Sequence, residues 1–199
     1  MPIDDVGTLN NPWGICGVTS SLYAVYNHSP SSAGIDAKAK DPIWVMNEIK
    51  SYLESLKFYG ETQLLNDITE FTRCFGDQFK SWSLEKYVNR VLNKSGPGFL
   101  PLENAKFSVA MPPHAVIDYL KRRCSFLHAK QVPLTPMAAE SIIGVYSNAR
   151  PSGMYGNLRH YFYQKNGTYY SWGLQYPDLT SALNAKLGYD GVSHQIVLS

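Results

Sequence analysis

The 199-residue chain is poor in the features that mark several common protein classes. Its three cysteines, at positions 16, 74 and 124, suggest neither a disulfide framework nor a Cys-x-x-Cys metal pair. No apolar run approaches the roughly 20 residues of a membrane span. The formal net charge of +2 is too small to imply binding to nucleic acid. We therefore expect no cofactor, no metal and no membrane span, and the cysteine usage fits reduced thiols in a cytosol.

The N-terminus offers no targeting signal. Residues 1–7 contain two acids and no apolar run, so they do not form a signal peptide. We expect synthesis in the cytoplasm, and any export would use a specialised secretion system. The only tight basic run, Lys121 to Arg123, is typical of a solvated helix end.

Composition favours a well-packed globule. Charged residues make up 17% of the chain, which is low for a globular protein. Aromatic residues make up 13%, which is high. The length suits one domain over residues 1–199, and we expect a monomer.

The first half of the chain reads as helical, from about residue 12 to 125. Val18, Leu22 and Val25 share one face of a helix over residues 15–26. After a loop over 28–41, apolar spacing predicts helices over 42–60, 61–75 and 83–94, with Ser83 as the N-cap of the last. A shorter helix is expected over 113–123.

The second half reads as a sheet, from about residue 140 to 199. Strands are expected over 142–146, 159–164, 168–172 and 195–198, and Asn166-Gly167 predicts a tight hairpin between the middle two. Helices followed by antiparallel strands define an α+β class.

Cys16 is the candidate nucleophile. It stands in Gly14-Ile15-Cys16-Gly17, where a loop becomes a helix. The free N–H groups of a helix N-terminus lower the pKa of a thiol, and the flanking glycines would let a substrate backbone approach. Cys74 and Cys124 lack this setting and read as structural. The alternative is that Cys16 is a small buried hydrophobe.

A cysteine nucleophile needs a base, usually histidine, held by a third polar group. His160 begins a strand just after a glycine-bearing loop, which would project it from the end of the sheet. His194, before the last strand, is the reserve.

The segment Gly14 to Ser20 resembles the nucleophile segment of the papain-like cysteine proteases. The order of cysteine, helical insertion and then histidine on a strand is also similar. The small size is closest in style to compact bacterial effector proteases of the YopT type and to bacteriocin-leader peptidases. The resemblance implies a papain-like fold in which the helical half packs against the antiparallel sheet.

The resemblance also implies further site residues. An amide six residues before the cysteine would complete the oxyanion hole, which points to Asn10, with Asn11 as the alternative; either could instead be a turn residue. Asp178 would orient His160, or it could cap the helix that follows it. Ser171-Trp172-Gly173 is similar to the Asn-Ser-Trp-Gly of papain, with Tyr170 in the place of the asparagine.

The expected function is a thiol hydrolase that cleaves peptide or isopeptide bonds of a protein substrate, in a bacterial effector. Two alternatives stay open. The same groups would serve a peptidoglycan-peptide amidase, a glutamine deamidase or an acyltransferase, and a non-enzymatic immunity or interaction protein could use Cys16 only for packing.

Overall fold

A computed structural model describes residues 13–28, 42–86, 107–124, 127–186 and 188–199. Its helices are α2 (Cys16–His28), α4 (Pro42–Phe58), α5 (Thr62–Arg73), α7 (Pro113–Arg123) and α8 (Leu179–Leu183), with 3-10 turns at Asp77–Phe79 and Tyr155–Asn157. Its strands are β1 (Trp13–Gly14), β2 (Phe107–Ser108), β3 (Ala129–Val132), β4 (Glu140–Tyr146), β5 (Leu158–Lys165), β6 (Thr168–Ser171), β7 (Leu174–Tyr176) and β8 (Gly191–Leu198).

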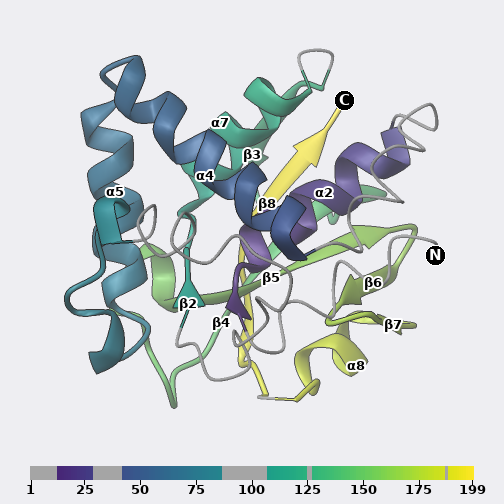
Figure 1. The fold of residues 1–199 in the computed structure, drawn as a ribbon. Helices are drawn as coiled ribbons and strands as arrows, with labels where there is room; N and C mark the ends of the chain where they lie inside the picture. Colours follow the sequence, from purple (N-terminus) through teal and green to yellow (C-terminus); the bar gives the residue numbers. More distant parts are fainter. Residues whose placement is uncertain (1–12, 29–41, 87–106, 125–126, 187) are drawn as a thin grey trace.

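Six of these strands form one antiparallel sheet in the order β3-β8-β4-β5-β6-β7 (Figure 1). The other two, β1 and β2, form a separate parallel pair that leads into α2. The predicted α+β class is confirmed: helices precede an antiparallel sheet.

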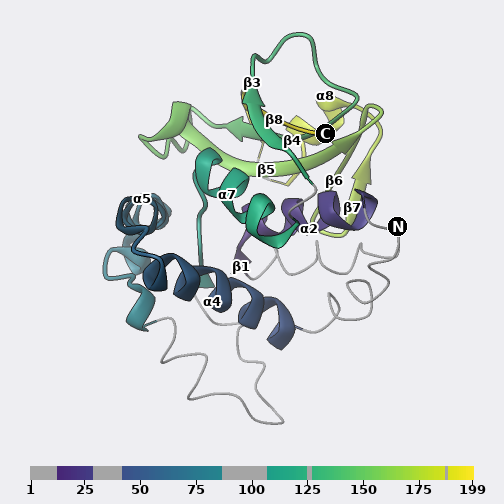
Figure 2. The same cartoon turned by 90° about the horizontal axis from the view of Figure 1, so that it is seen from above.

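The sheet separates two apolar clusters. On one face, α2 and α7 pack against the sheet with α4 and α5 beyond them, and α8 lies on the opposite face (Figure 2). The first face, here called the α2 face, buries Leu22, Tyr161 and Tyr163. The second, the α8 face, buries Phe162 and Trp172. Successive residues of β5 thus alternate between the clusters, as a strand requires.

Helix α2 runs along β5 in the same direction. The Tyr23 ring stacks on the Tyr163 ring with centroids 6.0 Å apart. At the end of the helix, His28 Nε2 lies 3.1 Å from the carboxylate of Glu140. The start of α2 therefore lies near the start of β5.

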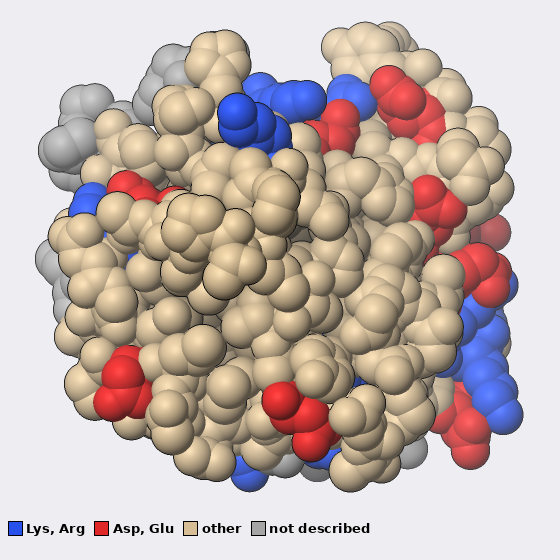
Figure 3. Space-filling view, turned by 180° about the vertical axis from the view of Figure 1, so that it is seen from behind, with Lys and Arg blue, Asp and Glu red and all other residues tan. Residues whose placement is uncertain are grey.

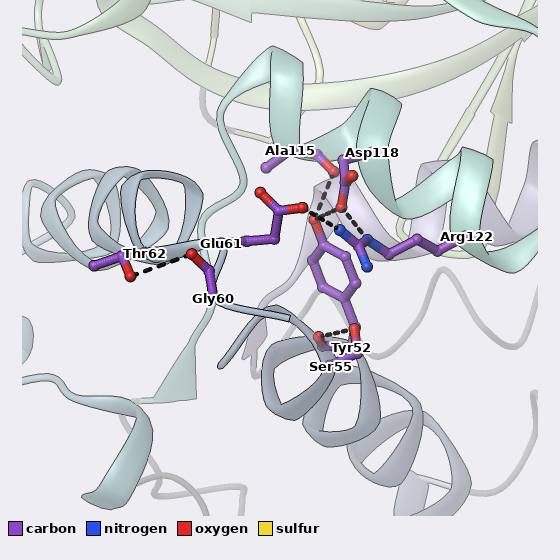
Figure 4. Close-up of polar contacts among 8 residues, drawn as sticks. All are labelled: Tyr52, Ser55, Gly60, Glu61, Thr62, Ala115, Asp118 and Arg122. Atoms are coloured by element: carbon purple, nitrogen blue, oxygen red, sulfur yellow. Dashed lines mark hydrogen bonds and ion pairs between the residues drawn. The ribbon is translucent and has the colours of Figure 1, made fainter. Parts of the chain in front are cut away.

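A polar network joins the helices on the α2 side (Figure 4). The Tyr52 hydroxyl of α4 donates to the carbonyl of Ala115 at 3.1 Å and to Asp118 Oδ2 at 3.0 Å, both on α7. Arg122 binds Asp118 at 2.7 Å and reaches Glu61, just before α5, at 3.2 Å. The network runs from the buried Tyr52 and Ala115 to the more exposed Asp118, Arg122 and Glu61, and so it positions α4 against α7 at the border of the core.

The predicted helices are confirmed over most of their length as α2, α4, α5 and α7. The start of the helix at 83–94 is also present, because Ser83 Oγ accepts from the N–H of Lys86 at 3.2 Å. Residues 87–94 of that helix and 29–41 of the expected loop lie outside the described residues.

The hairpin is confirmed: Asn166 and Gly167 have φ of 50° and 80°, as such a turn requires. The expected start of the sheet near residue 140 is too late, because β3 already pairs with β8. The last strand begins at Gly191 and not at Gln195, and so it contains His194. The edge strands β3 and β7 have four and three residues, too few for an alternating pattern to reveal them, although Gly173 marks the turn before β7.

Candidate active site

Cys16 is the first residue of α2, as predicted. The backbone carbonyl of Ile15 accepts from the N–H groups of Val18 and Thr19, both at 3.0 Å, and the buried Ile15 side chain anchors the turn. Gly17 is needed for packing: a Cβ there would lie 3.0 Å from Met111 Cβ. The expectation that this glycine leaves room for substrate is therefore wrong.

Three backbone N–H groups, those of Tyr161, Gly17 and Cys16 itself, lie close enough to the Cys16 sulfur to favour its charged form. All three lower the pKa of the thiol, and so does the nearby cation of Arg159. Burial outweighs them and raises the pKa from 9.0 to about 11. The sequence-based expectation of a lowered pKa is thus wrong for this conformation, and Cys16 is a thiol at neutral pH.

The first turn of α2 is attached to the open edge of β5. Strand β6 pairs with β5 from Lys165 to Tyr163, and this pairing does not extend to Tyr161. There, Ser20 Oγ donates to the Tyr161 carbonyl at 3.2 Å, while the Tyr161 N–H lies close to the Cys16 sulfur. Helix α2 thus replaces β6 as the partner of this part of β5, which places the sulfur against the peptide bond that joins His160 to Tyr161.

The His160 side chain points to the α8 face. Its ring stacks on Trp172 with centroids 4.1 Å apart, and Nε2 is 2.7 Å from Ser171 Oγ. The side chain is 6% exposed, and burial lowers its pKa from 6.5 to about 3, with a smaller contribution from Lys186. His160 is therefore a neutral imidazole at pH 7. Among the described residues, no hydrogen bond joins it to Cys16.

Asp178 is the N-cap of α8. Its carboxylate accepts from the Ser181 N–H at 2.7 Å, which lowers its pKa, and the residue is exposed. The alternative role predicted for Asp178 is thus confirmed. The described hydrogen-bond partner of His160 is Ser171. Ser171 belongs to the Ser-Trp-Gly segment noted in the sequence, but that likeness did not predict its contact with His160.

His194, the reserve base, lies on the α2 face but two strands away from β5, on β8. Gly144 of β4 pairs with Tyr161 on one side and with His194 on the other. Since neighbouring strands are about 4.8 Å apart, the backbones of His194 and Tyr161 are about 10 Å apart. The Cys16 sulfur lies on the β6 side of β5, farther still from His194.

Two residues that sequence reasoning missed lie near the sulfur. Tyr189, just before β8, stacks nearly parallel to His160 at 5.8 Å and interacts electrostatically with Cys16. Arg159 interacts with Cys16 as well and lies over the Phe75 ring. Neither belongs to a motif, because each reaches the site through the fold. The proposed oxyanion-hole residues, Asn10 and Asn11, lie outside the described residues.

Other features limit what the described surface can bind. In the described part of the chain no cluster of three or more His, Cys, Asp or Glu residues could hold a metal ion. None of the described helices is long and apolar enough to span a membrane. On the face seen in Figure 3, acidic and basic side chains are scattered toward the periphery, without a continuous basic patch.

Comparison with known protein families, with curated proteins and with solved structures gave no match for this chain.

Proposed function

We propose that the chain is a papain-like thiol hydrolase that cleaves peptide or isopeptide bonds of a protein substrate. One observation carries the proposal: the Cys16 sulfur, at the start of α2, lies near the backbone N–H of the residue that follows His160. The candidate nucleophile is thereby close to the backbone of the candidate base, whose imidazole rests on the α8 face. We propose a bacterial effector as the setting, made in the cytoplasm as a monomer and exported by a specialised system.

The resting site holds a neutral thiol and a neutral imidazole, so the proton moves during the attack and not before it. The sulfur forms a bond to the substrate carbonyl carbon while its proton passes to His160 Nδ1. His160 then gives that proton to the leaving amine, and the C–N bond breaks. Water hydrolyses the thioester, which releases a carboxylic acid and restores the thiol.

The hydrogen bond to Ser171 fits this role for His160. If the imidazole carries its proton on Nε2 and donates it to Ser171 Oγ, Nδ1 is free to accept from the thiol. Nδ1 is also the nitrogen closer to the backbone, and hence to the sulfur. The ring must turn from the α8 face toward Cys16, and substrate binding would provide the occasion for it. Because that turn breaks the hydrogen bond to Ser171, Ser171 holds the resting imidazole and favours its tautomer, and it does not orient the ring during the attack.

The transition state needs donors for the developing oxyanion. The backbone N–H of Cys16, at the start of α2, is the first donor that we propose. The side-chain amide of Asn10, or that of Asn11, is the second donor that the resemblance implies.

Selective alkylation tests the nucleophile. Iodoacetamide near neutral pH should label Cys16, and His160→Ala should slow that labelling, while Cys74 and Cys124 serve as internal references in the same mass spectrum. Labelling confined to Cys74 or Cys124 would contradict the proposal. Because the pKa of Cys16 is raised, the labelling rate should rise with pH up to about 11.

Product analysis tests the reaction. Wild type and Cys16→Ala are incubated with cell lysate and, separately, with purified peptidoglycan, and only products absent from the mutant count. New protein termini support a peptidase. Shortened peptidoglycan stem peptides would support an amidase instead, and a mass gain of about one dalton at glutamine would support a deamidase.

One observation favours a second candidate, a non-enzymatic interaction or immunity protein. The imidazole of His160 is buried between aromatic rings and bonded to Ser171, and the pKa of Cys16 is raised. A cysteine used only for packing would have these properties. It would resist alkylation in the folded protein, and His160→Ala would then leave its labelling unchanged.

A further inference from the structure

Arg159 occupies a bulge beside the site. On β4, Val145 pairs with His160 and Tyr146 pairs with Leu158, so Arg159 is an extra residue with no partner on that strand. A bulge redirects the side chain of its extra residue. Here the guanidinium carbon lies 4.5 Å from the centroid of the Phe75 ring, which supports one face of the group.

Among the described residues, Arg159 lacks the acidic partner that comparable arginines have. Arg73, Arg122 and Arg123 each lie within 3.2 Å of a carboxylate oxygen. Among the described residues, no carboxylate pairs with Arg159, although this side chain is partly buried. A half-buried guanidinium without a carboxylate among the described residues keeps its charge available to an external anion.

The surroundings of Arg159 are positive and adjoin the nucleophile. Burial and the nearby cation of Arg150 both lower the pKa of Arg159, yet a guanidinium remains charged at physiological pH. Arg150 donates to the carbonyl of Gly188 at 3.4 Å, which helps to hold it in place. Arg159 is also close enough to Cys16 for its charge to lower the pKa of that thiol.

We propose that Arg159, with Arg150 beside it, determines specificity by binding a substrate carboxylate next to the bond that Cys16 attacks. The substrate class is then peptides with an acidic side chain, or a free C-terminal carboxylate, near the scissile bond. This inference rests on the proposed function. A planar guanidinium binds a carboxylate through two parallel hydrogen bonds, and the Phe75 ring leaves its edge available for them.

Two alkylating reagents of similar size test the assignment without a known substrate. Iodoacetate carries the carboxylate and iodoacetamide does not, and the rate for each is measured at Cys16 by mass spectrometry. Relative to wild type, Arg159→Gln should lower the iodoacetate-to-iodoacetamide rate ratio by about three- to tenfold, since it removes one nearby positive charge. Arg159→Lys should retain most of the ratio.

The controls separate recognition from general effects. Arg122→Gln removes a guanidinium that is ion-paired in the helical layer, and it should leave the ratio unchanged. If Arg159 only stabilises a thiolate, its loss slows both reagents equally and the ratio stays constant, which would overturn the assignment. In wild type alone, succinate should protect Cys16 from iodoacetamide more than uncharged succinamide does. Equal protection would count against the assignment even if a variant failed to fold.

The outcomes also separate the two proposals. If neither reagent labels Cys16 in the folded protein, the proposed function fails, and the specificity assignment fails with it. If Cys16 is labelled and the ratio does not respond to Arg159, only the assignment fails.

If the ratio does respond, cleavage of a peptide library with amidated or free C-termini identifies which carboxylate of the substrate is bound. Cuts beside Asp or Glu in amidated peptides indicate a side chain, and cuts only in free-ended peptides indicate a terminus.

Discussion

Acidification should destabilise the protein because His160 is buried as a neutral imidazole. Burial lowers its pKa from 6.5 to about 3, so the unfolded chain binds a proton in a pH range where the folded protein does not. This contribution to stability is complete above pH 6.5 and is lost progressively as the pH falls toward 3. Each pH unit in that window costs about 1.4 kcal/mol. At about pH 4.5, two units below 6.5, the loss is about 2.7 kcal/mol.

Urea denaturation at about pH 7.5 and pH 4.5 measures this loss, with His160→Gln and His160→Asn as variants that cannot titrate. The carboxylates and His194 titrate in the wild type and in the variants alike. Their effects on the free energy of unfolding therefore cancel when the two are compared. Between the two pH values, wild type should lose about 2.7 kcal/mol more than either variant. Equal losses would show that His160 is not a buried neutral group, and the account of a neutral base would fail.

Three further substitutions test how the site is positioned. Gly144→Ala brings a Cβ within 2.8 Å of Leu158 Cδ1 and should cost about 1–3 kcal/mol of unfolding free energy by overpacking, measured by denaturant titration. Asp178→Ser keeps a capping oxygen, so stability should stay within about 0.5 kcal/mol of wild type and activity should persist, whereas a catalytic carboxylate would make activity collapse. Tyr52→Phe removes the hydroxyl that donates to Asp118 and should cost about 0.5–1.5 kcal/mol, measured by thermal unfolding, with no change in Cys16 labelling.

The sequence was sufficient where local patterns determine structure. Apolar residues at helical spacing predicted α2 and α4, because such a face must be buried. Asn166-Gly167 predicted the hairpin, because both positions need positive φ. Cys16 was correctly placed at the start of α2 for the same local reason.

Properties that depend on tertiary contacts were not predictable. The helix N-terminus suggested a lowered pKa for Cys16, but only the fold reveals that burial outweighs the three N–H donors. Ser171 lies 11 residues from His160 in the chain and becomes its partner through the pairing of β5 with β6. That no described carboxylate pairs with Arg159 also depends on tertiary structure, because it is decided by which carboxylates the fold brings near the guanidinium.

The register of the sheet favours one histidine as the base. In a two-residue hairpin the residues that flank the turn exchange backbone hydrogen bonds, so the N–H and C=O of Lys165 point toward β6. Alternation then directs the backbone of Tyr161 to the same side, and there it meets Cys16 and Ser20. The sulfur is thus held next to His160 by the hairpin that the sequence predicts. His194 lies on β8, on the far side of β4 from β5, so its backbone is farther from the sulfur than that of His160.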